Sequence, residues 1–87
     1  MKNYNKRVKV LWKVIDIQKK IYGEEHPDVA TSYNNIGEGY VSQGDYARAL
    51  EYHTKALEIR KKIFGEEHPD VATSYNNVGS ICCFQGD

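Results

Sequence analysis

The thirteen residues Gly23–Asn35, GEEHPDVATSYNN, decide the fold, because they recur without change at residues 65–77. The same 42-residue offset pairs residues 43–45 with 85–87 and residues 19–21 with 61–63. Self-similarity at a fixed period of about 20–50 residues is typical of repeat architectures, in which each unit packs against its neighbours. We therefore expect residues 23–64 to form one complete repeat. Residues 1–22 would be the second helix of a degenerate preceding half-repeat, and residues 65–87 the first helix of a following, truncated repeat.

The apolar residues within one repeat follow a helical period. In the first half of the complete repeat, spacings of 4, 3 and 4 residues place four of them on one helix face. They are Val29, Tyr33, Ile36 and Tyr40. The second half shows the same periodicity between residues 46 and 63. Small residues at Gly37, Ala49 and Ala56 would let the two helix backbones approach closely.

Turn and capping residues indicate where the helices begin and end. Pro27 suits a first helical turn, since its missing N–H is not needed there. Gly44 can adopt a positive φ, Asp45 can cap the helix that follows, and Gly65 can end that helix. The pattern predicts helices over about residues 3–21, 27–42, 45–63 and 69–84. Short connections make neighbours antiparallel, so we expect an all-α, right-handed solenoid of helical hairpins with about four helices.

The composition is globular and excludes several classes of protein. Hydrophobic residues make up 40% of the 87 residues, which is too apolar for a disordered tail. The formal net charge is zero, although residues 1–22 carry +6 and residues 23–87 carry −6. No apolar run approaches the roughly 18 residues of a membrane-spanning helix. The adjacent Cys82 and Cys83 form no spaced disulfide or zinc pattern, which indicates a reducing, cytoplasmic setting.

Eight residues of the complete repeat have the spacing of a known signature: Tyr33, Ile36, Gly37, Tyr40, Gly44, Tyr46, Ala49 and Ala56. On these residues the whole chain resembles the tetratricopeptide repeat (TPR) family. The 42-residue period, the His-Pro pairs, the Asn-Asn pairs and the stretch Leu57–Arg60 resemble the longer subclass of kinesin light chains and related scaffold proteins. Arg7 and Val14 depart from the pattern, since they stand where the complete repeat has alanines. Cys82 likewise stands where the complete repeat has Tyr40.

The resemblance implies a protein–protein interaction module. In the family, the first helices of successive repeats line a concave groove that takes an extended peptide or a partner helix. Carried over to this chain, the groove residues are Thr31, Asn34, Asn35, Glu38, Ser42, Thr73, Asn76, Asn77 and Ser80, with Val41, Cys83 and Phe84 beside them. Asn35 and Asn77 are the best single candidates, because an amide can donate to and accept from a peptide backbone at once. The acidic Glu38 favours a neutral or basic peptide.

We expect neither an enzyme nor a metal or cofactor site. His26 and His68 each precede a proline, where we interpret them as helix-start residues, and His53 as a satisfied or half-exposed packing residue. Cys82 and Cys83 are interpreted as one core cysteine and one groove or edge cysteine that act as small hydrophobic residues. No nucleophile has a plausible base, and no phosphate-binding loop occurs.

Two alternatives to a binding groove stay open. The repeat could be a structural spacer that sets a distance within a larger assembly. Alternatively, the basic helix over residues 2–20, which contains Trp12, could bind an anionic membrane surface, a calmodulin-like partner or nucleic-acid phosphates. The repeat register favours a packed helix there, because Lys13, Lys19 and Lys20 have counterparts in the complete repeat, so we expect no membrane or nucleic-acid partner. Uncovered apolar faces at both ends predict self-association or dependence on flanking repeats.

Overall fold

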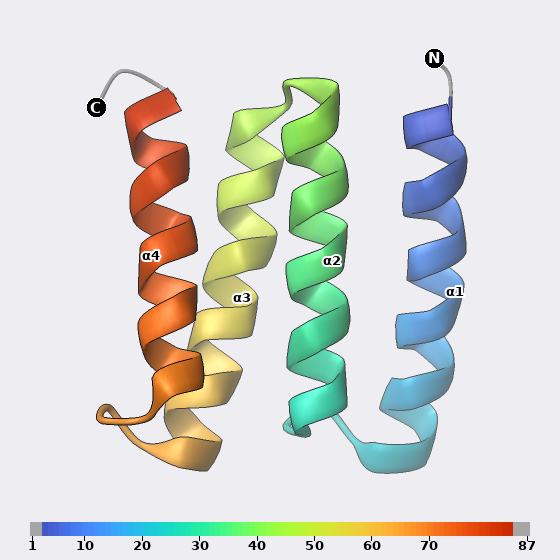
Figure 1. Cartoon of the computed structure of the whole chain (residues 1–87). Helices are drawn as coiled ribbons and strands as arrows, with labels where there is room; N and C mark the ends of the chain where they lie inside the picture. Colours follow the sequence, from blue (N-terminus) through green and yellow to red (C-terminus); the bar gives the residue numbers. More distant parts are fainter. Residues whose placement is uncertain (1–2, 85–87) are drawn as a thin grey trace.

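The computed structural model describes residues 3–84, which form four consecutive helices (Figure 1). These are α1 (Asn3–Tyr22), α2 (Pro27–Gln43), α3 (Tyr46–Phe64) and α4 (Pro69–Phe84). Every bound lies within one residue of the predicted one, and the all-α array of helical hairpins is confirmed. The first residue of the predicted basic segment, the repeated residues 85–87 and the side chain of Arg7 lie outside the described part.

The repeated segment builds the same helix start twice. The Asp28 N–H donates to His26 Nδ1 at 3.0 Å, which satisfies one of the free N–H groups at the start of α2. The imidazole also stacks on Tyr22, with ring centroids 4.1 Å apart. The second copy repeats these contacts at 3.1 Å and 4.1 Å, with Asp70, His68 and Phe64. The interpretation of both histidines as helix-start residues is confirmed.

The turns also follow the sequence. Gly44 has φ 80°, and its N–H donates to the Val41 carbonyl at 2.9 Å, which closes α2. Asp45 then caps α3, since its Oδ1 accepts from the Arg48 N–H at 3.2 Å. Gly65, with φ 84°, ends α3. Gly44 and Asp45 reverse the chain between α2 and α3 in a short turn, so the two helices run antiparallel.

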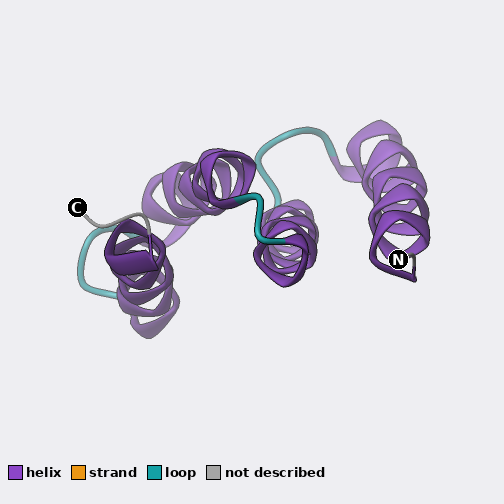
Figure 2. Ribbon diagram, turned by 90° about the horizontal axis from the view of Figure 1, so that it is seen from above, coloured by secondary structure: helices purple, strands orange, loops and turns teal. Residues whose placement is uncertain are grey.

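The helices lie in two rows when viewed along their length (Figure 2). The row of α2 and α4 lies on one side, and the row of α1 and α3 on the other. Since α2 is packed between α1 and α3, it supplies most of the central cluster. That cluster comprises Ile15, Val29, Ala30, Tyr33, Ile36, Ala56 and Ile59. Ala49 and Ala56 are fully buried, as expected for a close approach of helix backbones.

Contacts between helices follow the 42-residue register as well. Ser32 Oγ of α2 donates to Gln18 Oε1 of α1 at 2.5 Å. At the positions 42 residues later, the Arg60 guanidinium of α3 donates to Ser74 Oγ of α4 at 2.8 Å. Thus α1 packs against α2 as α3 packs against α4, although Val14 replaces the alanine of the complete repeat.

Candidate peptide-binding face

The nine predicted groove residues all lie on α2 and α4, the helices of one row (Figure 2). Seven of them are exposed: Thr31, Asn35, Glu38, Ser42, Thr73, Asn76 and Ser80. Asn34 and Asn77 are half-buried. Of the flanking residues, Cys83 and Phe84 are exposed and Val41 is half-buried. We call the surface of these two helices the α2/α4 face.

The two half-buried amides on the α2/α4 face bond to each other. Asn77 Nδ2 of α4 donates to Asn34 Oδ1 of α2 at 2.9 Å. His53 Nδ1 of α3 lies 3.0 Å from the same oxygen. Because Oδ1 can only accept, Nδ1 carries the imidazole proton and donates to it. One amide oxygen therefore joins α2, α3 and α4.

This bond makes Asn35 and Asn77 different, although they occupy the same repeat position. Asn35 is exposed, whereas Asn77 already donates one amide N–H to Asn34 of the neighbouring repeat. The prediction from sequence ranked Asn35 and Asn77 equally, because they lie in identical segments. The presence of Asn34 in the repeat before Asn77 is the sequence signal that could have distinguished the two residues.

His53 lies beneath the α2/α4 face, in a setting that differs from the one expected. Its side chain is 1% exposed, and a Cβ added at Gly37 would meet His53 Cδ2 at 2.6 Å. Its Nε2 lies 3.4 Å from Glu38 Oε2. Among residues 3–84, Nε2 is a buried side-chain nitrogen without a hydrogen-bond partner. The ring is therefore buried rather than half-exposed, because the missing side chain of Gly37 lets it reach the interior. It is also not fully satisfied, since its Nε2 has no hydrogen-bond partner in the described part of the chain.

Electrostatics keep this imidazole neutral at pH 7. Burial lowers the pKa of His53, because the imidazolium would lose its hydration; the carboxylate of Glu38 opposes that effect and the guanidinium of Arg60 adds to it. The neutral ring turns the Nε2 lone pair toward Glu38, so it offers that carboxylate no proton. Glu38, with a half-exposed side chain, remains an acceptor for a donor group arriving from solvent.

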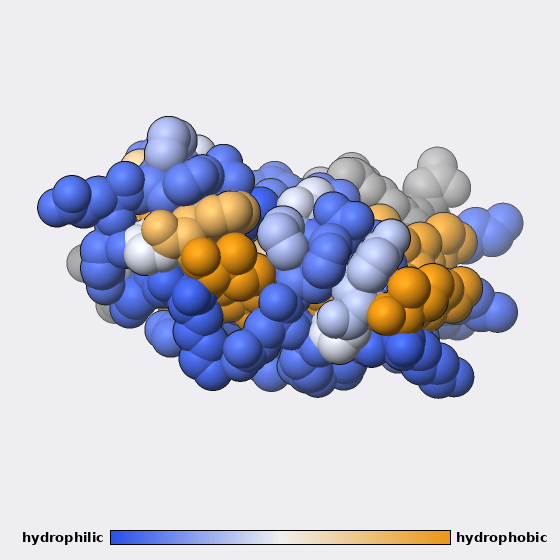
Figure 3. Space-filling view, turned by 90° about the horizontal axis from the view of Figure 1, so that it is seen from below, coloured by the Kyte–Doolittle hydropathy of each residue, from blue (hydrophilic) through white to orange (hydrophobic). Residues whose placement is uncertain are grey.

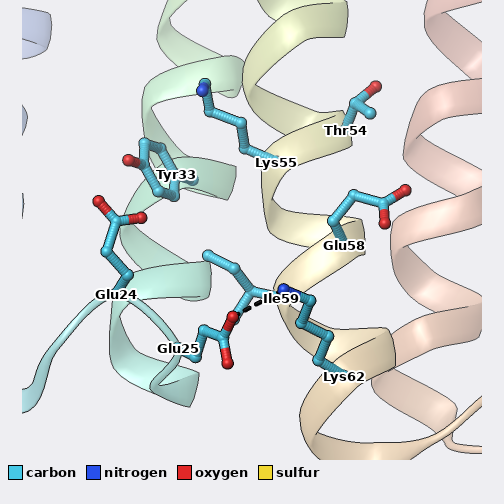
Figure 4. A pocket seen from close by; sticks show the side chains of 8 residues that line it. All are labelled: Glu24, Glu25, Tyr33, Thr54, Lys55, Glu58, Ile59 and Lys62. Atoms are coloured by element: carbon cyan, nitrogen blue, oxygen red, sulfur yellow. Dashed lines mark hydrogen bonds and ion pairs between the residues drawn. The ribbon is translucent and has the colours of Figure 1, made fainter.

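A cavity of about 240 Å³ lies between α2 and α3, away from all nine predicted groove residues (Figure 4). Lys62 Nζ bonds to Glu25 Oε2 across it at 2.7 Å, and Lys55 Nζ lies 5.9 Å from the centroid of the Tyr33 ring. The pairing with Glu25 raises the pKa of Lys62. Cations and carboxylates thus meet each other here, as on a solvated ionic surface.

The rest of the described chain adds no cluster that suggests a different chemistry. Over residues 3–84, no three His, Cys, Asp or Glu side chains are grouped to hold a metal ion. In the same range, no helix is long and apolar enough to cross a membrane. The thiols of Cys82, which is half-buried, and Cys83, which is exposed, are both free.

Comparison with known families supplies an independent finding. A family model described as tetratricopeptide repeat matches residues 1–28 and 29–70. The second matched segment is 42 residues long, which is the period of the internal repeat. The two segments together cover α1, α2, α3 and the start of α4. No curated protein matches the sequence significantly.

Proposed function

Because the chain belongs to the tetratricopeptide repeat family, whose repeats generally mediate protein–protein interaction, we propose that it binds a segment of a partner protein on the α2/α4 face. The observation that carries the proposal is the series of seven exposed polar side chains on these two helices. Amides and hydroxyls of this kind can hydrogen-bond a peptide backbone whatever its side chains are.

The charge of the face indicates the chemistry of the partner. Neither α2 nor α4 contains a lysine or an arginine. Their charged residues are Asp28, Glu38 and Asp70. An acidic tail or a C-terminal carboxylate would therefore meet no cation here, and it would be repelled by Glu38. A neutral or basic peptide, or the basic side of a partner helix, fits the face better.

Three finer features belong to the same proposal. The 42-residue period and the capped His-Pro helix starts support membership of the subclass found in kinesin light chains. That subclass implies a scaffold that brings partner proteins together. The free thiols of Cys82 and Cys83 support a reducing compartment such as the cytoplasm.

A peptide-library screen of the parent chain beside Asn35→Ala and Glu38→Gln tests the function. Both residues are exposed, and neither change removes the bond between Asn34 and Asn77. Peptides selected by the parent should lose about tenfold or more in affinity for Asn35→Ala. Basic peptides should be weakened selectively by Glu38→Gln.

The matched control is Glu58→Gln, an exposed carboxylate of α3 that lines the cavity away from the α2/α4 face. It should bind every selected peptide as the parent does, and circular dichroism should show equal helicity for all four proteins. If no peptide binds the parent, or if Glu58→Gln weakens binding as much as Asn35→Ala does, the proposed face is wrong. Absence of binding would favour the structural spacer.

A further inference from the structure

The outer side of α1 is a row of uncovered apolar side chains (Figure 3). Val10, Val14, Ile17 and Ile21 are between 38% and 67% exposed. The residues 42 positions later are Tyr52, Ala56, Ile59 and Ile63, which pack against α2. The exposed side of α1 is thus equivalent to the side of α3 that packs against α2. In the part of the chain that the structure describes, no helix covers it. We call this row the α1 face.

The outer side of α4 is the counterpart of that surface. Tyr75 is 47% exposed, and a Cβ added at Gly79 would have nothing within 4 Å. The equivalent residues 42 positions earlier, Tyr33 and Gly37, lie under Tyr52 and His53 of α3. In the described chain, the exposed side of α4 is thus equivalent to the side of α2 that packs against α3. We call it the α4 face.

We propose that the α4 face of one copy of this chain docks on the α1 face of a second copy, in the register that α2 has on α3. The contact would be head to tail, and it goes beyond the binding of a partner on the α2/α4 face. The occupant follows from the sequence, since each face is complementary to the other by the 42-residue register that already builds the α2–α3 contact.

The α2–α3 contact within the chain and the proposed contact between copies differ at two positions that face each other. Within the chain, His53 covers Gly37 and its Nε2 faces Glu38. In the docked pair, the register puts Leu11 over Gly79, and Ser80 takes the place of the carboxylate. An apolar side chain would thus face a neutral hydroxyl, so the contact between copies buries neither an unpaired imidazole nor a carboxylate.

Charge also favours the head-to-tail arrangement. The register brings Lys20 against Glu67, as Lys62 meets Glu25 at 2.7 Å, and Lys13 over Tyr75, as Lys55 lies over Tyr33. Residues 1–22 carry a net charge of +6, whereas residues 65–84 carry three carboxylates and no lysine or arginine. Two α1 faces or two α4 faces would place like charges together, so contact between unlike ends is the favoured one.

A head-to-tail contact leaves one free face of each kind, so it predicts an open series of copies. Sedimentation equilibrium of the full chain should show a weight-average mass that rises with concentration beyond that of a dimer. Two variants block one face each. Ile17→Asp places a charge in the α1 face, and Gly79→Gln places a side chain where Leu11 would lie. Each changes an exposed position with open space around it, so the fold should be kept.

Mixing the two variants tests the direction of the contact. Each variant alone should stay monomeric up to a concentration at least tenfold above the one at which the parent associates. An equimolar mixture should form a dimer and nothing larger, because only the α4 face of Ile17→Asp and the α1 face of Gly79→Gln remain free. Circular dichroism should show equal helicity for all proteins. A monomeric parent, a mixture that stays monomeric, or a variant that dimerises alone would overturn the proposal.

Discussion

The segments Gly23–Asn35 and Gly65–Asn77 have the same sequence and different surroundings. Both begin a helix with the same histidine cap, and both bury the side that faces the preceding helix, so that Val29 and Val71 are each fully buried. The other side differs, since Tyr33 is 5% exposed and Tyr75 is 47% exposed. Local sequence thus determines the helix and its start, whereas the next helix in the array determines whether the second side is core or surface.

The comparison also separates two uses of one residue type. Asn35 has no helix of a preceding repeat beside it in the described chain, and its side chain is exposed. Asn77 has α2 beside it and bonds to Asn34. An asparagine at this repeat position is therefore a candidate ligand-binding group at one end of an array and a link between repeats elsewhere.

The largest contrast should appear when the two tyrosines are truncated. Tyr33→Ala removes a buried aromatic side chain that stacks on Tyr52, and it should cost about 3–5 kcal/mol of unfolding free energy. Tyr75→Ala removes a half-exposed side chain and should change stability by about 0.5 kcal/mol. Urea unfolding at a concentration where the chain is monomeric measures both. Equal losses would mean that α3 does not cover α2 as described.

The glycines that follow the repeated segments should respond with opposite signs. A Cβ at Gly37 would lie 2.6 Å from His53 Cδ2, so Gly37→Ala should destabilise the chain by about 1–3 kcal/mol. Gly79 has open space, so Gly79→Ala should stabilise the helix by about 1 kcal/mol through its higher helix propensity. Thermal unfolding followed by circular dichroism reports the two signs, and a gain for Gly37→Ala would contradict the close packing of His53.

The smallest expected effect is a pH dependence of the unfolding free energy that comes from His53, which is buried between α2 and α3. In the unfolded chain His53 titrates near 6.5, and burial lowers its pKa in the folded chain. Below about pH 6.5 the unfolded chain binds a proton that the folded chain does not. Stability should therefore be complete above pH 6.5 and fall as the pH drops toward the folded pKa, by about 1.4 kcal/mol per unit of pKa difference.

Replacing the imidazole isolates this contribution. His53→Leu introduces the residue type that α1 has at the same repeat position, Leu11. Urea unfolding at pH 7.5 and pH 5 should show a smaller loss of stability for this variant than for the parent. The two proteins differ only at position 53, so the difference between their pH profiles isolates the contribution of His53. Two parallel pH profiles would show that His53 is not held neutral by burial.

Much of the fold could be predicted because its signals are local. Pro27, Gly44 and Asp45 mark helix ends by the conformations and hydrogen bonds of their own neighbourhoods, and the predicted bounds were correct to one residue. The 42-residue identity then determined how hairpins repeat, which the contacts of Ser32 and Ser74 reproduce. The placement of the predicted binding residues on α2 and α4 followed from the same register.

The interior of the candidate site could not be predicted in this way. The bond from Asn77 to Asn34 joins residues 43 positions apart, and the contact of His53 with Asn34 joins residues 19 positions apart. Neither pair has a counterpart within the chain, because the position equivalent to Asn34 one repeat earlier, and those equivalent to His53 and Asn77 one repeat later, fall outside residues 1–87. Without a second copy of the contact, the sequence carries no sign that the Nε2 of a buried imidazole would be left without a partner.

The amide oxygen of Asn34 has a consequence for cooperativity. In a linear array, each repeat is stabilised by its own contacts and by coupling to its nearest neighbour. This oxygen accepts from α3 of its own repeat and from α4 of the next, so one atom contributes to both kinds of stabilisation. An array with such an amide at every boundary should therefore unfold more cooperatively than an array without it.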